Sequence, residues 1–176
     1  MANSKRRGSS FEREVAKFLT KWLTGKEKPY AFWRSPSSGG LATISNSTEV
    51  CGDIIAIRPE GEVLTRTWSV EIKTGYLDAD PLKHLKKTKN ETIKSFWEQC
   101  IRDSRTANKS GMLIFRKKGS KPIVGIEMSM FEKLKPMLSG INQLILCYSN
   151  DLPDLVLMDM EDFFNIIKPD IIVSTV

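Results

Sequence analysis

The sequence predicts an α/β fold in a single domain, and three observations lead to that prediction. Two stretches, 10–23 and 90–107, repeat apolar residues at helical spacing. Short apolar runs rich in β-branched residues lie between and after them, as is typical of strands. No internal repeat and no long linker divides the 176 residues, which are enough to bury a sizeable core.

Composition and charge favour a soluble protein that binds a polyanionic partner. The chain is 40% hydrophobic and 27% charged, as ordinary globular proteins are, and its net charge is +6. Its three cysteines, Cys51, Cys100 and Cys147, are scattered, which fits a reducing compartment and neither a disulfide framework nor a zinc site. Because no apolar run could span a membrane and the first residues do not resemble a secretory signal, we expect a cytoplasmic protein with no membrane partner.

The first helix is expected over 10–23, after a basic tail of residues 1–8. Ser9 and Glu12 form a capping-box pattern at its start. Glu12 also falls within the apolar arc of this helix, where a carboxylate is costly unless it is capped, paired or bound to a metal. Capping and a place in a functional site remain equal alternatives for Glu12, and Glu14 is the weaker candidate. The arc consists of Phe11, Val15, Phe18, Leu19, Trp22 and Leu23.

A short strand over 30–34 leads into a loop rich in serine and glycine that could hold phosphates. Arg34 supplies a cation, and the loop supplies hydroxyl groups and backbone amides. Such runs are also typical of flexible linkers, but we favour the phosphate cradle. The serines of this loop are Ser35, Ser37 and Ser38.

The stretch from Gly52 to Thr74 predicts two strands, 53–57 and 67–74, joined by a turn that contains Pro and Gly. In the second strand Glu71 and Lys73 point to the same face, about 7 Å apart. If the two strands pair as a hairpin that brings Asp53 close to Glu71, two carboxylates and an ammonium group converge beside the sheet.

This grouping suits metal-dependent hydrolysis of a phosphodiester. Carboxylate oxygens are hard ligands of the kind that Mg²⁺ accepts. A bound metal activates water and stabilises developing negative charge, and a nearby lysine can orient or deprotonate that water. The alternative is a surface hairpin whose Glu71 and Lys73 face solvent. The position of Asp53 at the mouth of the first strand, and the strongly apolar flanks, favour a site.

The segment after these strands, 77–94, carries many lysines and few acids. Such a run is typical of a solvated helix face, but beside a nuclease site it would form a strip for non-specific contacts with a nucleic-acid backbone. The lysines that we expect to make these contacts are Lys83, Lys86 and Lys87.

The second helix, over 90–107, places Trp97 in its core-facing stripe, so we expect this side chain to be packed and not stacked on a base. A buried strand over 112–115 follows it. The remainder predicts four strands or apolar segments and two helices, which could extend the sheet or form a dimer face. They span 123–127, 129–138, 144–148, 155–158, 161–167 and 171–173.

The spacing Asp53 … Glu71-Ile72-Lys73 resembles the PD-(D/E)xK nuclease superfamily. Together with the segments 7–14 and 34–36, it is most similar to archaeal-type Holliday-junction resolvases. The resemblance implies a restriction-endonuclease-like core of order α-β-β-β-α-β over residues 9–118, in which helices flank a mixed central sheet. Residues 119–176 would then form a C-terminal α/β extension.

The resemblance also implies a mechanism and a substrate. Asp53, Glu71 and the Ile72 carbonyl would bind Mg²⁺, for which Mn²⁺ could substitute, and Lys73 would assist the attacking water. Glu12 would support the site from the first helix, and Arg7 and the Arg34 loop would lie beside the DNA. The expected substrate is branched DNA, cut by a homodimer to leave 5′-phosphate ends.

Two other functions remain open from the sequence. A restriction-like or repair nuclease would keep the same chemistry and act on linear duplex or single-stranded DNA. A non-catalytic nucleic-acid-binding protein would keep only the fold, and its DNA binding would survive both EDTA and the Asp53→Ala substitution. A purely structural role would show no salt-sensitive affinity for DNA.

Overall fold

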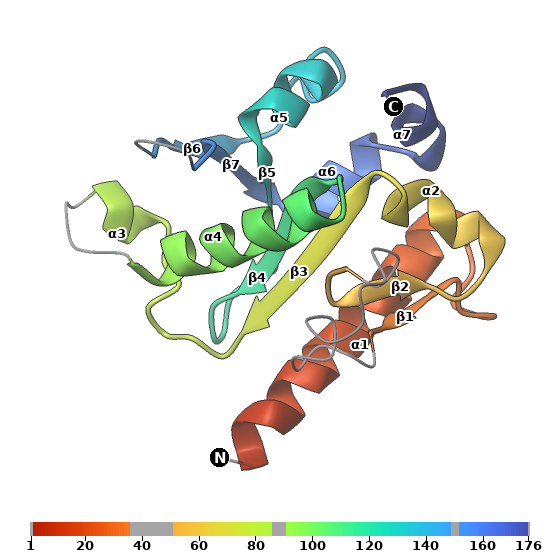
Figure 1. Ribbon diagram of the computed structural model, residues 1–176, viewed down its shortest axis with the longest axis horizontal. Coiled ribbons are helices and arrows are strands. Elements are labelled where there is room, and N and C mark those ends of the chain that lie inside the picture. The colour runs from red at the N-terminus through yellow and green to blue at the C-terminus, as the bar shows by residue number, and fades with distance from the viewer. Residues whose placement is uncertain (1, 36–50, 86–90, 149–151, 176) are drawn as a thin grey trace.

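The computed structural model describes residues 2–35, 51–85, 91–148 and 152–175, and it consists of one main sheet with helices on both faces (Figure 1). A separate two-stranded ribbon lies beside the edge of this sheet. The strands are β1 (Phe32–Arg34), β2 (Ile54–Ala56), β3 (Trp68–Thr74), β4 (Ser110–Arg116), β5 (Ile123–Glu127), β6 (Gln143–Leu146) and β7 (Leu155–Asp159). The helices are α1 (Ala2–Thr24), the 3₁₀ helix η2 (Pro59–Gly61), α2 (Glu62–Thr65), α3 (Leu82–Leu85), α4 (Glu91–Thr106), α5 (Met128–Leu134), α6 (Met160–Ile166) and α7 (Pro169–Thr175).

The main sheet is mixed, with five strands in the order β3-β4-β5-β7-β6. β3 and β4 are parallel, and every other neighbouring pair is antiparallel. The parallel connection runs through α3 and α4, as expected for a crossover that returns to the same sheet. This arrangement confirms the predicted α/β fold with a mixed central sheet flanked by helices, and it leaves β3 at one edge of that sheet.

α1 covers one face of the sheet with the arc that the sequence predicts. Its residues Phe11, Val15 and Leu19 are buried against Val70 and Ile72 of β3. The helix begins at Ala2 and not near Ser10, so Ser9 and Glu12 are interior helix residues and the capping-box interpretation is wrong. The physical reason is that Ala, Lys and Arg in the first turns favour a helix, and a single glycine does not stop it.

α4 covers the opposite face, where its apolar stripe meets the alternate side chains of the same strands. Ile93, Trp97 and Ile101 pack with Leu113 and Phe115 of β4. Trp97 is fully buried, and its indole N–H donates to the Pro153 carbonyl oxygen at 2.7 Å. The prediction that this tryptophan is packed and not stacked on a base is therefore confirmed for the free protein.

The predicted hairpin between 53–57 and 67–74 is wrong. β2 pairs antiparallel with β1, so that Arg34 lies opposite Ile54, whereas β3 pairs with β4. The connection between β2 and β3 is not a tight turn, because it contains η2 and α2 and buries Leu64 completely. Burial of that leucine in the α1-side core separates the two strands that a simple turn would have joined.

The C-terminal third of the chain extends the sheet, which was one of the two alternatives open from the sequence. β5, β7 and β6 continue outward from β4, and α6 and α7 return to the α1 side of the core. The apolar segment 171–173 lies in α7, where Ile172 is buried. Within the described ranges, no helix has both the length and the apolar character needed to cross a membrane.

Candidate active site

Asp53 is held against the outer edge of β3 although β2 and β3 do not pair. Its backbone amide donates to the Val70 carbonyl oxygen at 2.7 Å, and its carbonyl oxygen accepts from the Ser35 amide at 2.7 Å. The residue thus links the end of β1 to the edge of β3, because its backbone N–H and C=O are bonded to different segments. Asp53 thus lies close to β3 although the expected hairpin does not form, because its backbone and not a paired strand makes the contact.

Gly52 allows that close approach. Its φ is +89°, a left-handed backbone conformation that residues with a Cβ rarely adopt. A Cβ on Gly52 would lie 2.7 Å from the Val70 carbonyl oxygen and 2.9 Å from the Val70 nitrogen. Only glycine therefore permits the backbone before Asp53 to pass so close to β3.

The Asp53 carboxylate meets the backbone of Ile72. Oδ2 of Asp53 accepts from the Ile72 amide at 2.8 Å. The N–H and C=O of one strand residue point to the same side of that strand, so the Ile72 carbonyl also faces this edge and not β4. The carboxylate of Asp53 and the carbonyl of Ile72, both expected from the sequence to bind a metal, therefore share one edge.

Glu71, Lys73 and Gln99 form a closed group on the α4 side of β3. Nζ of Lys73 lies 2.5 Å from Oε1 of Glu71 and donates to Oε1 of Gln99 at 2.9 Å. Nε2 of Gln99 in turn donates to Oε1 of Glu71 at 2.8 Å. The side-chain amide of Gln99, on α4, thus accepts a hydrogen bond from Lys73 through its oxygen and donates one to Glu71 through its nitrogen. These two bonds restrain both charged side chains.

The two carboxylates carry raised pKa values. Burial, followed by the charge of Glu71, raises the pKa of Asp53 to about 7, although the Ile72 amide opposes this shift. Burial also raises the pKa of Glu71, against the opposing effect of Lys73. For Lys73, burial alone would lower the pKa, but the charge and hydrogen bond of Glu71 outweigh it and raise the value. The negative charge of Asp53 and Glu71 at this edge is therefore greater than Lys73 alone compensates.

Glu12 lies close enough to this crowded charge to contribute to it. It raises the pKa values of both Asp53 and Glu71 by charge repulsion, although it is not the main cause of either shift. Oε2 of Glu12 accepts from Nε of Arg34 at 2.8 Å, so the ion pair joins α1 to the end of β1. The Glu12 side chain is thus paired at the border of the site, while Glu14 points elsewhere and pairs with Arg116.

The residues that the sequence predicts to contact DNA differ in their exposure to solvent. Ser35 is buried, and its amide supports Asp53, so in this arrangement it does not face a substrate. Lys83 is half-exposed on α3 and pairs with Asp78. The side chains of the others lie outside the described residues; these are Arg7, Ser37, Ser38, Lys86 and Lys87.

The residues at this edge fit a divalent cation. Among the described residues, no three His, Cys, Asp or Glu side chains come together as a metal site. The expected ligands, however, are only two carboxylates and a backbone carbonyl, and Mg²⁺ commonly completes such a set with water. The raised pKa values of Asp53 and Glu71 show that a further positive charge at this edge would stabilise both ionised groups.

This arrangement, on a mixed sheet between helices, is that of the PD-(D/E)xK nucleases, which is the class that the sequence resemblance predicts. The family model described as Phage putative PDDEXK endonuclease matches residues 3–174, and the chain belongs to that family. The superfamily prediction is thereby confirmed, and the archaeal resolvase type stays a prediction. No curated protein and no solved structure matches the chain.

Gln99 is the residue of this site that sequence reasoning missed. It lies beside Phe96 and Cys100 of the apolar stripe, and it is part-buried. A polar residue at the border of a buried helix stripe was the available signal. The signal could not be used from sequence alone, because nothing local indicates that α4 places this position over Glu71.

Proposed function

We propose that the protein is a Mg²⁺-dependent endonuclease that hydrolyses DNA phosphodiester bonds, with Mn²⁺ able to replace Mg²⁺. The observation that carries the proposal is the convergence of Asp53, Glu71 and Lys73 at the open edge of β3. Membership in a PDDEXK endonuclease family supports the nuclease chemistry.

Asp53, Glu71 and the Ile72 carbonyl hold the metal in this proposal. A bound Mg²⁺ supplies activation of a water molecule and stabilisation of the charge that develops on the phosphate. Lys73 carries a proton at neutral pH, since its pKa is raised, and it therefore acts as a donor that orients the attacking water. Glu12 adds negative charge at the border of the site, and Arg34 restrains Glu12.

The preferred substrate is branched DNA of the Holliday-junction type. The support is the resemblance of segments 7–14 and 34–36, and of Asp53 with Glu71-Ile72-Lys73, to archaeal-type resolvases. Symmetric cutting of two strands requires two active sites, so a homodimer is part of the same proposal. Linear duplex or single-stranded DNA is the alternative substrate, and a binding protein without catalysis is the alternative of another class.

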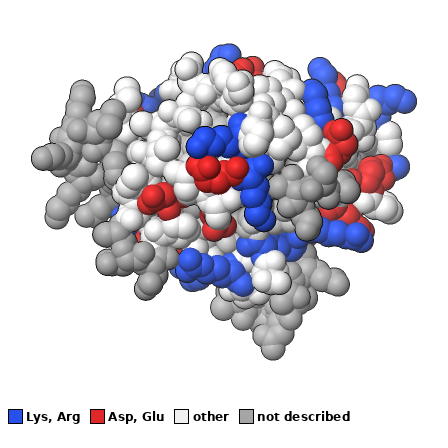
Figure 2. Space-filling model, turned by 90° about the horizontal axis from the view of Figure 1, so that it is seen from above, with Lys and Arg blue, Asp and Glu red and all other residues white. Residues whose placement is uncertain are grey.

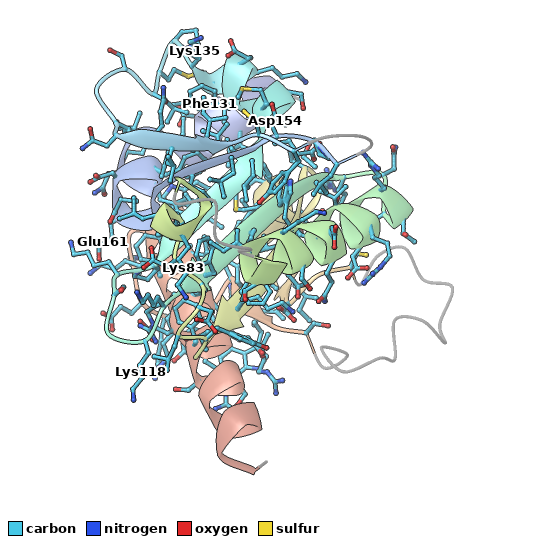
Figure 3. All side chains as sticks on the ribbon, turned by 90° about the vertical axis from the view of Figure 1, so that its left-hand side faces the viewer. Lys83, Lys118, Phe131, Lys135, Asp154 and Glu161 are labelled. Carbon is cyan, nitrogen blue, oxygen red and sulfur yellow. The ribbon has the colours of Figure 1, made fainter. Side chains whose placement is uncertain are left out.

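The test is a cleavage assay with Mg²⁺ on a four-way junction, a linear duplex and a single strand of matched sequence. Wild type runs beside Asp53→Asn, Glu71→Gln and Lys73→Ala, with Glu161→Gln as the matched control. Glu161 is an exposed acid on α6 (Figure 3), so its substitution should leave cleavage unchanged. We expect paired cuts near the branch point, lost in the first three variants and in EDTA.

The other outcomes separate the alternatives. Equal cutting of linear DNA with the same variant pattern would keep the nuclease and remove the resolvase. Salt-sensitive binding without cleavage under any divalent metal would leave a binding protein. A monomeric mass by light scattering, both free and on the junction, would contradict the homodimer.

A further inference from the structure

Tyr76 presents an exposed aromatic ring just after β3, the strand that carries Glu71 and Lys73. The residue is 48% exposed, and its neighbour Leu77 is 66% exposed. Exposed apolar groups that lie together often mark a binding surface, so the surroundings of this ring decide what it could bind. Among the described residues, the other large hydrophobic side chains with comparable exposure are aliphatic; they are Ile57, Leu77, Leu82 and Ile145.

Tyr76 lies on the same face of the sheet as Lys73, the face that α4 covers. Its ring packs edge to face with the ring of Phe96 on α4, with the ring centres 4.8 Å apart and the planes at 67°. Phe96 belongs to the buried cluster between α4 and the sheet. Nζ of Lys73 lies 5.8 Å from the centre of the same Phe96 ring. Phe96 is therefore the common neighbour of Tyr76 and of the lysine of the candidate site.

The distance between this ring and the site is short on the scale of a DNA strand. Gln99, which binds both charged side chains of the site, is three residues from Phe96, so the two share one face of α4. The distances of 5.8 and 4.8 Å that meet at Phe96 together place the centre of the Tyr76 ring within about 11 Å of Nζ of Lys73, and this is about three times the 3.4 Å between successive phosphates along the axis of one DNA strand. A strand with a phosphate at Lys73 would therefore bring a nearby base within reach of Tyr76.

The Tyr76 ring keeps at least one face free of Phe96. In an edge-to-face pair, one ring contributes an edge and the other contributes a single face. If Tyr76 contributes the edge, both of its faces are free of Phe96, and if it contributes a face, the other face remains. Ala79, which is buried in the α4-side cluster, anchors the chain that follows. The ring is thus held by packing and is open to a planar ligand.

We propose that Tyr76 stacks on a base of the DNA strand that is cut, within about three nucleotides of the scissile phosphate. This inference rests on the proposed nuclease function and narrows the class of its substrate. A base offers its face to a side chain only where it has left the stack of the duplex, as at a branch point, in a gap or in a single strand. The protein should therefore prefer DNA with an unstacked base beside the cut, whatever the identity of that base.

The face seen from above Figure 1 does not indicate a competing path for DNA. Figure 2 shows that lysine and arginine are interspersed with acidic side chains on that face, and such a mixture does not form a path of one charge for a polyanion. A control residue is available at the opposite edge of the sheet from β3, where β6 carries the exposed Ile145 (Figure 1). Substitution of Ile145 removes an exposed apolar side chain far from the candidate site.

The experiment measures equilibrium DNA binding in an Asp53→Asn background, which keeps the substrate uncut. Two DNAs of matched sequence are compared: a continuous duplex, and one with three unpaired nucleotides on each side of the cleavage position mapped with the wild type. Tyr76→Leu keeps apolar packing on Phe96 but removes the planar ring. We expect it to weaken binding to the unpaired DNA at least about fivefold, and binding to the duplex by less than about twofold. Tyr76→Phe and Ile145→Ala should change neither.

A second measurement assigns the contact to one base. A single abasic nucleotide replaces each unpaired nucleotide in turn, and the effect of Tyr76→Leu is measured on each DNA. Two changes that remove the same interaction are not additive, so at one position near the cut the substitution should cause no further loss of affinity. At the other positions its effect should remain. A purely structural role of Tyr76 would instead give the same loss at every position.

The inference is overturned if Tyr76→Leu behaves as Ile145→Ala does, if it weakens binding to both DNAs alike, or if its effect is equal at every abasic position. The nuclease proposal stands in each of these cases, provided that the wild type cleaves and Asp53→Asn does not. If the wild type neither binds nor cleaves DNA, both proposals fail.

Discussion

At the scale of single residues, burial of the Asp53 carboxyl group makes the stability of the metal-free protein depend on pH. Its carboxyl group has an ordinary pKa of 3.8, which rises to about 7 in the folded protein. The folded state thus binds this proton more tightly than the unfolded chain does. The contribution to stability is complete below about pH 4 and is lost as the pH rises to 7, so the ionised carboxylate destabilises the metal-free fold.

Asp53→Asn should therefore stabilise the metal-free protein. The amide oxygen can still accept the Ile72 N–H, but no charge is buried. At pH 8 we expect a gain of roughly 2–4 kcal/mol in the free energy of unfolding, shrinking as the pH falls towards 4. Denaturant titrations in EDTA over this pH range measure the effect.

Two comparisons support or contradict this account. Mg²⁺ should raise the melting temperature of the wild type and have little effect on Asp53→Asn, because only the wild type keeps both carboxylates. Asp78→Asn should not stabilise the protein, since its hydrogen bond with Lys83 lowers the pKa of Asp78. If Asp53→Asn is no more stable than wild type at pH 8, the burial argument is wrong.

Gln99 is expected to position Glu71 and Lys73 without contacting the substrate. Gln99→Leu removes both amide hydrogen bonds and leaves the two charged side chains less well oriented. We expect single-turnover cleavage to slow roughly 10- to 100-fold, with DNA affinity within about twofold of wild type.

The matched control for this prediction is Glu98→Gln, an exposed neighbour on α4 that pairs with Lys94. Its cleavage rate should equal that of the wild type. Equal rates for Gln99→Leu and Glu98→Gln would show that the amide does not position the site. A loss of affinity that matches the loss of rate would instead indicate a contact with DNA.

At the scale of secondary-structure elements, the site depends on β3 being an edge strand. One side of β3 pairs with β4, and the other side receives Asp53 through the Val70 carbonyl and the Ile72 amide. In a central strand those backbone groups would be bonded to a neighbouring strand, and the Ile72 carbonyl would not be available for a metal. The hairpin prediction was therefore wrong about the strand with which β2 pairs. Asp53 nevertheless lies at the edge of β3.

Gly52→Ala should break this junction. The new Cβ would clash with the backbone of Val70, and the positive φ adds strain. We expect a loss of roughly 2 kcal/mol or more in stability, and cleavage reduced further than the folded fraction explains, since Asp53 would shift. Chemical denaturation and single-turnover cleavage together measure both effects.

Gly140→Ala is the control that separates clash from strain. Gly140 has a φ of +92°, but a Cβ there would meet nothing within 4 Å. It should cost only about 1 kcal/mol and leave cleavage unchanged. Equal effects of the two substitutions would show that the close approach to Val70 is not important.

At the scale of the whole molecule, the elements that carry the candidate site and the C-terminal third share one core. Phe11 of α1, Val70 of β3, Ile126 of β5 and Phe163 of α6 belong to the same buried cluster. On the side away from β3, residues Met112 to Phe115 of β4 pair with β5. The nuclease elements thus rely on residues beyond 118 for both packing and hydrogen bonds.

A chain that ends at residue 118 should therefore not fold. It would expose the α1-side cluster and leave β4 as a second open edge, so we expect no cooperative unfolding transition by circular dichroism. The full-length protein should unfold in one transition. A truncated chain that unfolds cooperatively would show that residues 9–118 form an independent unit.

Most of the elements and the faces of the helices could be predicted from the sequence. The helical stripes that contain Val15 and Trp97 and the alternation of Val70, Glu71 and Ile72 are local patterns, and local periodicity decides them. The start of α1 was missed because capping signals compete with good helix formers in the preceding residues.

The sequence by itself thus determined the α/β class and the strand that carries Glu71 and Lys73, because these follow from spacing along one segment. Only the tertiary structure decided that β2 pairs with β1, that Gln99 reaches Glu71, and that Arg116 pairs with Glu14 of α1. These features join segments far apart in the chain. Which of them meet depends on the packing of Leu64, Phe11 and Trp97 in the shared cores, and local propensity does not contain that information.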